Sequence, residues 1–98
     1  MQYILLAYDA KDKDAAKRRL DSRDAHLSRA KRFFERGKLL YGVALFDDSE
    51  KVIGSCMIFD FDSKGELDVW LEEEPYLLNK VWETVEITKC KVGPMFER

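Results

Sequence analysis

The chain has 98 residues, of which 46% are hydrophobic and 37% are charged, a composition typical of one soluble globular domain spanning residues 1–98. Its formal net charge of −2 excludes a nucleic-acid or membrane-surface role that depends on bulk positive charge. Cys56 and Cys90 lie far apart, without the short spacing of zinc or redox motifs, which favours reduced thiols and a cytoplasmic location. With one histidine and no Cys/His cluster, the sequence predicts neither a metal site nor another cofactor.

The first predicted element is a strand over residues 3–8, a short apolar run bounded by polar residues. It lacks a basic leader and is too short to span a bilayer, so we expect neither export nor membrane insertion. A helical run follows from about Asp14 to Arg36. Asp12 or Asp14 can cap its start, and Gly37 suits its end because glycine readily adopts a positive φ.

Apolar residues recur along one stripe of this helix, and the stripe predicts the face that the helix buries. The stripe contains Ala16, Leu20, Leu27, Ala30 and Phe34, with Arg23 inside it. His26 lies roughly 80° from the centre of the stripe, at the border between core and solvent. Such a histidine can be partly desolvated and still accessible to a ligand. His26 is therefore either a boundary residue without a role or a group that transfers protons, and Arg23 either extends to solvent or binds a ligand.

Two apolar runs follow, residues 39–46 and 52–61, each apolar on both sets of alternate positions. The polar segment 47–51 joins them, so the pattern predicts an antiparallel hairpin. Within the second run, Gly54 and Ser55 either expose a backbone N–H and a hydroxyl to a cleft or mark a bulge in the sheet.

A second, shorter helix is predicted to open at Asp62-Ser63 and to end before Pro75, with one further short turn over residues 76–81. Because Glu74 precedes a proline, its backbone is biased towards an extended conformation that directs it away from the helix. Residues 82–92 then alternate like an outer strand with one solvated face. The apolar side of this strand carries Val85 and Ile87, with Cys90 as a third candidate.

The predicted order of strand, helix, strand, strand, helix and strand is the ferredoxin-like βαββαβ arrangement of the α+β class. In this fold a four-stranded antiparallel sheet carries both helices on one face. The other face would leave apolar side chains of the central strands in water, as a patch larger than soluble monomers usually tolerate. We therefore expect a homodimer in which the two sheet faces pack together.

Several short motifs, in this order and spacing, resemble the YciI-like (YCII-related domain) family over essentially the whole chain. They are Lys17-Arg18-Arg19-Leu20, Arg23-x-x-His26-Leu27-Ser28-Arg29-Ala30-Lys31, Gly54-Ser55, Trp70, Glu74-Pro75-Tyr76 and Pro94-x-Phe96. The resemblance implies a single YciI-like domain with the fold of the dimeric α+β barrels, in agreement with the predicted order of elements. It also implies a histidine–aspartate pair in a cleft beside the sheet. His26 matches the histidine, whereas Glu74 stands where the family has aspartate, so the geometry of the pair can differ.

Two functions remain open from the sequence. The first is a small-molecule enzyme that uses a histidine–carboxylate pair for metal-independent acid–base chemistry of the elimination, isomerisation or lactone type. Its candidate catalytic residues are His26 and Glu74, and its candidate substrate-binding residues are Arg23, Ser55 and Tyr76, where the planar guanidinium of Arg23 suits an acidic group. The ligand would be small and either anionic or aromatic. The alternative is a non-catalytic dimeric domain that binds small ligands or a partner.

Each candidate also has a purely structural interpretation. Arg23 can instead pair with Glu74 or Asp24, and the charged run Glu72-Glu73-Glu74 can be a solvated helix end. The two tryptophans, Trp70 and Trp82, are expected in the core or at a dimer contact. The basic residues of the long helix are interleaved with acidic ones and indicate a solvated face rather than a nucleic-acid site. They are Lys17, Arg18, Arg19, Arg29, Lys31, Arg32 and Arg36.

Overall fold

A computed structural model describes residues 1–97 and has the predicted order of elements. In addition to the four strands and two main helices, the chain has a short helix that begins at Pro75 and a 3₁₀ turn near the C-terminus. The elements are β1 (Gln2–Asp9), α1 (Ala15–Glu35), β2 (Leu39–Phe46), β3 (Val52–Asp60), α2 (Lys64–Glu72), α3 (Pro75–Leu78), β4 (Trp82–Cys90) and η1 (Pro94–Phe96).

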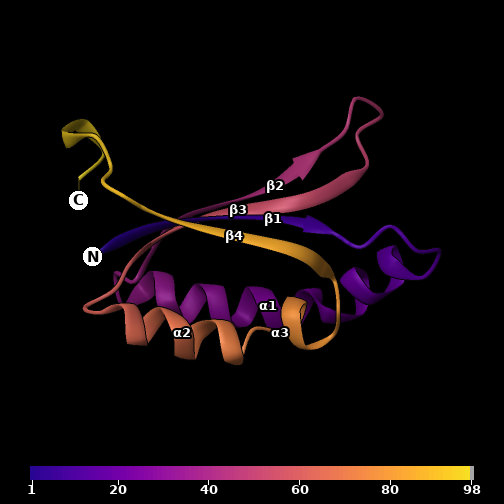
Figure 1. Ribbon diagram of the computed structural model, residues 1–98, viewed down its shortest axis with the longest axis horizontal. Coiled ribbons are helices and arrows are strands. Elements are labelled where there is room, and N and C mark those ends of the chain that lie inside the picture. Colours follow the sequence, from indigo (N-terminus) through magenta and orange to yellow (C-terminus); the bar gives the residue numbers. More distant parts are fainter. Residues whose placement is uncertain (98) are drawn as a thin grey trace.

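The strands form one antiparallel sheet in the order β2-β3-β1-β4, with β2 and β4 at its edges. All three helices lie beneath the same face of the sheet (Figure 1). The hairpin of β2 and β3 projects away from the helices at one end of the molecule (Figure 1). The ferredoxin-like α+β fold predicted from the sequence is therefore confirmed.

The core lies between the sheet and the helices. Its sheet side consists of alternate residues on paired strands, such as Leu5 opposite Met57 and Tyr3 opposite Phe59. Trp70 from α2 and Trp82 from β4 are 1% and 4% exposed and belong to this core, as predicted. The remaining core residues are Ala7, Leu39, Phe61, Leu67, Tyr76 and Val81.

The opposite face of the sheet also carries apolar side chains, and it is turned away from the three helices. Ile4 pairs with Ile58 on this face, and Leu6 pairs with Cys56. On the neighbouring edge strand, Tyr41 and Val43 are 47% and 55% exposed. In Figure 1 this face is the upper side of the sheet, away from all three helices.

Both cysteines are free and half-buried, and burial raises the pKa of each thiol. Val85 and Ile87 face the helices, as predicted, because they pair with the inward residues Ala7 and Leu5. Cys90 pairs with Gln2 on the other face of the sheet, so the third candidate for the inward side of β4 was wrong. Within residues 1–97, no helix is long and apolar enough to cross a membrane.

The buried face of α1 differs from the predicted apolar stripe. Ala16, Leu20, Leu27 and Phe34 are exposed, Ala30 is half-buried, and Leu20 alone has 71% of its surface exposed. The residues that α1 buries are Ala15, Ser22, His26 and Arg29. The polar groups of this face have partners at the two ends of α3, which compensate the loss of water. Asn79 Nδ2 donates to Ser22 Oγ at 2.9 Å, and Glu74 binds both His26 and Arg29.

The ends of the helices follow the sequence closely. Asp14 occupies the N-cap position of α1 without a side-chain cap, while Asp12 accepts a hydrogen bond from the Asp14 N–H. Two hydrogen bonds of 2.7 Å from Arg18 also reach Asp12 and hold the pKa of that carboxyl well below its usual value. Gly37 has φ +75° just after α1, as expected for its C-terminal stop. Glu74 is extended, with φ −75° and ψ 121°, in the kink between α2 and α3.

Candidate functional site

The kink before α3 brings Glu74 against the middle of α1. His26 Nδ1 and Glu74 Oε2 share a short hydrogen bond, and the two residues are 8% and 0% exposed. Because a carboxylate only accepts, Nδ1 carries the hydrogen in this contact. In the neutral ring this tautomer has a lone pair on Nε2, and Nε2 has no hydrogen-bond partner among the described residues.

The second oxygen of Glu74 is held by a buried arginine. Arg29 Nη1 donates to Glu74 Oε1 at 2.8 Å, and Arg29 Nη2 donates to the Trp70 carbonyl at 3.1 Å. Glu74 is therefore no part of a solvated helix end, although Glu72 and Glu73 are exposed. Its partner is Arg29 rather than Arg23, so the alternative ion pair proposed for Arg23 is absent.

Aromatic rings fix the plane of the imidazole. The Tyr76 ring stacks on the His26 ring with centroids 4.0 Å apart and planes 13° apart. The Trp82 ring meets the imidazole edge-on, with centroids 6.0 Å apart. Burial raises the pKa of the Tyr76 phenol above its ordinary value, partly offset by the nearby Arg19. The ring of His26 is thus restrained by stacking on one face and by Glu74 at Nδ1.

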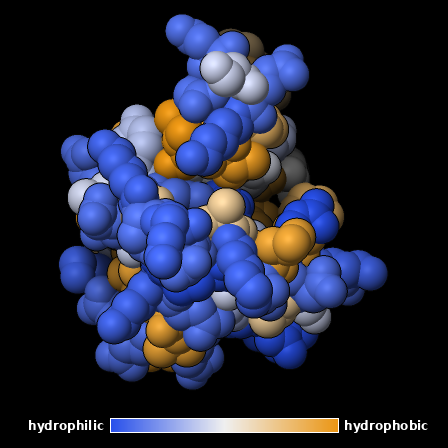
Figure 2. Space-filling view, turned by 90° about the vertical axis from the view of Figure 1, so that its right-hand side faces the viewer, coloured by the Kyte–Doolittle hydropathy of each residue, from blue (hydrophilic) through white to orange (hydrophobic). Residues whose placement is uncertain are grey.

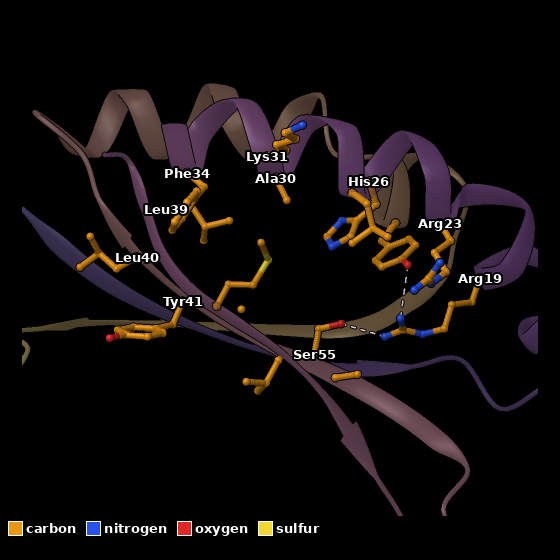
Figure 3. Close-up of a pocket in the computed structure, with 16 residues that line it drawn as sticks. Arg19, Arg23, His26, Ala30, Lys31, Phe34, Leu39, Leu40, Tyr41 and Ser55 are labelled. Carbon is orange, nitrogen blue, oxygen red and sulfur yellow. Dashed lines mark hydrogen bonds between the residues drawn. The ribbon is translucent and has the colours of Figure 1, made fainter. Parts of the chain in front are cut away.

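Arg19 links the other polar residues at this end of the site. It pairs with Asp9 at 2.7 Å. It also donates to Ser55 Oγ at 2.8 Å and to the Tyr76 hydroxyl at 3.3 Å (Figure 3). Trp82 Nε1 also donates to Ser55 Oγ, at 3.2 Å. Ser55 therefore accepts two hydrogen bonds and keeps its own hydroxyl hydrogen for a further partner.

Gly54 is needed for the packing of the strands and does not line the cleft. A Cβ at this position would lie 2.2 Å from the Ala7 carbonyl oxygen, so only glycine allows β3 to approach β1 this closely. The register of β2 and β3 shifts next to it, between Leu45 and Phe46, as the bulge interpretation predicted. The Gly54 carbonyl accepts from Arg19 at 3.0 Å, and Gly54 does not line the cavity beside His26.

A cavity of about 570 Å³ opens between α1 and the β2–β3 side of the sheet, and His26 forms part of its wall (Figure 3). Ser55 and Tyr76 line the same cavity. Most of its remaining wall is apolar, including three of the residues predicted for the buried stripe of α1. These apolar lining residues are Leu27, Ala30, Phe34, Leu39, Leu40, Ala44 and Met57. Tyr41 and Val43 of β2 also border the cavity, although their register places them with Ile58 and Cys56 on the opposite face of the sheet.

The charged residues at this cavity are all basic. Arg19, Arg23 and Lys31 line it, and none of the described lining residues is acidic. Arg23 is exposed and makes no ion pair within residues 1–97, so its guanidinium is free to meet a ligand. The five sequence candidates therefore converge: Glu74 binds His26, and His26, Arg23, Ser55 and Tyr76 line one cavity.

Arg19 and Arg29 are the two site residues that sequence reasoning assigned to a solvated face. Both instead donate to buried or half-buried groups of the site. A signal was present, because Arg19, Ser22, His26, Arg29 and Phe33 recur at alternating spacings of three and four along one side of the helix. The polar stripe is the face that α1 buries. The apolar stripe, which the sequence analysis chose as the buried face, forms the cavity wall instead.

The family model of the YCII-related domain matches residues 1–91. The chain belongs to this family. Protein YciI of Escherichia coli and Protein YciI of Shigella flexneri are each 29% identical to this YCII-related domain over 97 residues, covering 93% of it and 97% of the relative. The family resemblance inferred from the sequence motifs is therefore confirmed.

A solved structure shares the fold of this YCII-related domain at low sequence identity. It is the 5-chloro-2-hydroxyhydroquinone dehydrochlorinase TftG from Burkholderia phenoliruptrix, in complex with 2,5-dihydroxybenzoquinone. The two chains superpose with a TM-score of 0.79 at 19% identity, over 97% of this chain and 98% of the other. At this identity the similarity establishes the α+β architecture and nothing about the reaction.

Proposed function

We propose that this domain is a small-molecule enzyme in which His26 and Glu74 carry out acid–base chemistry of the elimination, isomerisation or lactone type. The observation that carries the proposal is the position of the imidazole between a buried carboxylate and a cavity. One ring nitrogen is engaged by Glu74, and the other has no protein partner and can meet a ligand.

The proton route follows from the tautomer. Nε2 of neutral His26 accepts a proton from the bound ligand, while Nδ1–H remains on Glu74. The imidazolium that forms is stabilised by the adjacent carboxylate, and Nε2 then returns the proton to the product or to the leaving group. Glu74 in this scheme orients the ring and balances its charge without taking the proton itself.

Arg29 acts as a positioning residue for this pair. It binds Oε1 of Glu74, so Oε2 is left for His26, and it supplies the opposite charge for a carboxylate that has no exposed surface. The Trp70 carbonyl fixes the guanidinium in turn. The longer glutamate side chain thus reaches two partners on α1, which supports its replacing the aspartate of the family.

The ligand that fits the cavity is small, with an apolar or aromatic body and an anionic group. The body would lie against the apolar wall, and the anionic group would meet Arg23, with Ser55 and Tyr76 contributing polar contacts near the imidazole. The compounds named for the structurally similar TftG, a chlorinated hydroxyhydroquinone and a dihydroxybenzoquinone, are small cyclic compounds with acidic hydroxyl groups. They are the first compounds to test as ligands here.

The proposal can be tested by incubating the enzyme in D₂O with a panel of small carbon acids, lactones and chlorinated hydroquinones. NMR would follow hydrogen exchange, isomerisation and lactone opening, and an ion-selective electrode would follow chloride release. We expect at least one compound to react, and His26→Asn to slow it by a factor of about 10² or more. Glu74→Gln should have a similar effect. Equal rates for wild type and both variants would refute the proposal.

The same cavity supports the second candidate function, a non-catalytic binding domain. Its apolar wall and free Arg23 would hold an aromatic anion whether or not a proton moves. A compound that binds with equal affinity to wild type and His26→Asn, and that undergoes no change with either, would favour this alternative.

We further propose that two copies associate through the uncovered sheet face. The exposed Tyr41 and Val43 and the half-buried Ile4, Leu6 and Ile58 form a contiguous apolar surface on that face, of the type that dimers bury. Sedimentation at tens of micromolar would test this, and a monomer at that concentration would contradict it.

A further inference from the structure

A second cavity, of about 610 Å³, lies at the N-terminal end of α1 beneath the β2–β3 hairpin. Its walls come from the loop between β1 and α1, from the first half of α1 and from the ends of the two hairpin strands. Figure 2 faces this end of the molecule. Hydrophobic surface lies there beneath the projecting hairpin tip and is surrounded by hydrophilic surface.

The two cavities adjoin each other. Arg19, Arg23 and Ala44 line both of them, and Arg23 lies three residues before His26 on the same helix. A ligand long enough to pass Arg23 would therefore reach from the first cavity to the border of the second. Together the cavities form one groove along α1, which we call the α1 groove, with His26 near its middle and the hairpin over one end.

The residues that line the α1 groove carry mostly positive charge, although the whole chain has a net charge of −2. Six lysine and arginine residues line the groove, against two acidic ones, Asp9 and Asp12. Both acidic residues are already paired, Asp9 with Arg19 and Asp12 with Arg18, each at 2.7 Å. The basic residues that make no ion pair within residues 1–97 are Lys11, Lys13, Arg23, Lys31 and Lys51.

Part of the wall of the second cavity is apolar. Leu20 and Phe46 line it and are 71% and 58% exposed. A ligand bound there would cover them while its charged groups meet the lysines. The combination of apolar wall and lysine rim is complementary to an anion that has an apolar body.

We propose that the α1 groove binds one elongated ligand, an aromatic or apolar compound that carries two or more anionic groups. One end lies at His26, and the multiply charged end, of the phosphate, sulfonate or carboxylate type, lies among Lys11, Lys13 and Lys51. The inference rests on the proposed function only for the reaction at the His26 end. Binding at the lysine end does not depend on catalysis.

Two fluorescent probes with the same aromatic body test this proposal. Pyrene-1-sulfonate carries one negative charge, and pyrene-1,3,6,8-tetrasulfonate carries four. Fluorescence anisotropy would give the Kd of each at low salt, for wild type and for three variants. The first variant, Lys11→Gln/Lys13→Gln/Lys51→Gln, removes the lysines of the second cavity. The matched control, Lys80→Gln/Lys89→Gln/Lys91→Gln, removes three exposed lysines elsewhere, so both triple variants have the same net charge.

We expect the tetrasulfonate to bind wild type at least tenfold more tightly than the monosulfonate. The groove variant should weaken tetrasulfonate binding by about tenfold, and the control variant by less than about twofold. Equal binding of the two probes, or equal weakening by the two triple variants, would overturn the proposal, because either result means that charge is not recognised at this place. The third variant, His26→Asn, should keep tetrasulfonate binding within about twofold. Loss of activity in that variant alone therefore concerns the proposed function, not the groove.

Discussion

The buried contact between Arg29 and Glu74 makes a quantitative prediction about stability. Removing one partner of a buried ion pair leaves an uncompensated charge and typically costs about 3–5 kcal/mol. Arg29 and Glu74 are 8% and 0% exposed, and their oxygen–nitrogen distance is 2.8 Å, so both belong to this class. We expect Arg29→Met and Glu74→Gln each to lower the free energy of unfolding by about 3 kcal/mol.

A double variant measures the interaction between Arg29 and Glu74 separately from the contacts that each makes with other groups. Once both charges are gone, neither is buried alone, so Arg29→Met/Glu74→Gln should cost about as much as either single change. The coupling energy of the double-mutant cycle is then about 2–4 kcal/mol. Urea unfolding would measure it through the fluorescence of the buried Trp70 and Trp82, at one fixed protein concentration. A loss of 3 kcal/mol corresponds to a shift of the midpoint by about 2 M urea for a domain of this size.

The exposed pair of Lys64 and Asp68 provides the control cycle. These side chains are 69% and 52% exposed, lie four residues apart on α2 and are 3.2 Å from each other. Solvent screens such a pair, and its coupling should be at most about 0.5 kcal/mol. If the cycle of Arg29 and Glu74 gives a coupling as small as this one, the argument that the arginine compensates a buried carboxylate is wrong.

Three further predictions concern the aromatic stack, the sheet and its open face. Burial raises the folded-state pKa of the Tyr76 phenol above 10.0. The stability that the neutral phenol contributes is therefore complete below pH 10 and is lost as the pH rises through the folded-state pKa. Tyr76→Phe should therefore lose less stability than wild type in thermal melts above pH 10. Gly54→Ala would place a Cβ 2.2 Å from the Ala7 oxygen and should lower the free energy of unfolding in urea by more than about 2 kcal/mol. Gly42→Ala would place its Cβ 3.8 Å from Met57 Cγ and should leave the free energy of unfolding nearly unchanged. Val43→Glu should shift the sedimentation coefficient towards that of a monomer without lowering helix content.

The fold could be predicted because each element has a local signal. Alternation and apolar runs gave the four strands, while Gly37 and Pro75 marked the ends of the two main helices. The kink at Glu74 also followed from local chemistry, since a residue before proline avoids the helical region. The βαββαβ order then leaves few ways to arrange the sheet.

The orientation of α1 could not be predicted from hydrophobicity, because the decisive partner is distant in sequence. Arg29 is buried against Glu74, 45 residues away, and Arg19 is half-buried against Asp9 and Ser55. A helical pattern shows which residues share a side, but not which side has partners for its charges. The apolar stripe was real, but its residues line the two cavities beside α1, and of the five only Ala30 is also partly buried against the core.

The kink between α2 and α3 separates two tasks that many active sites combine. Glu74 is placed by the main chain next to Pro75 and is held from α1, whereas much of the facing cavity wall comes from the edge strand β2. Under the proposed function, substitutions along β2 would therefore reshape the cavity while the contacts of Glu74 with His26 and Arg29 stay intact. Such a division would allow ligand preference to change without changing the proposed proton-transfer pair.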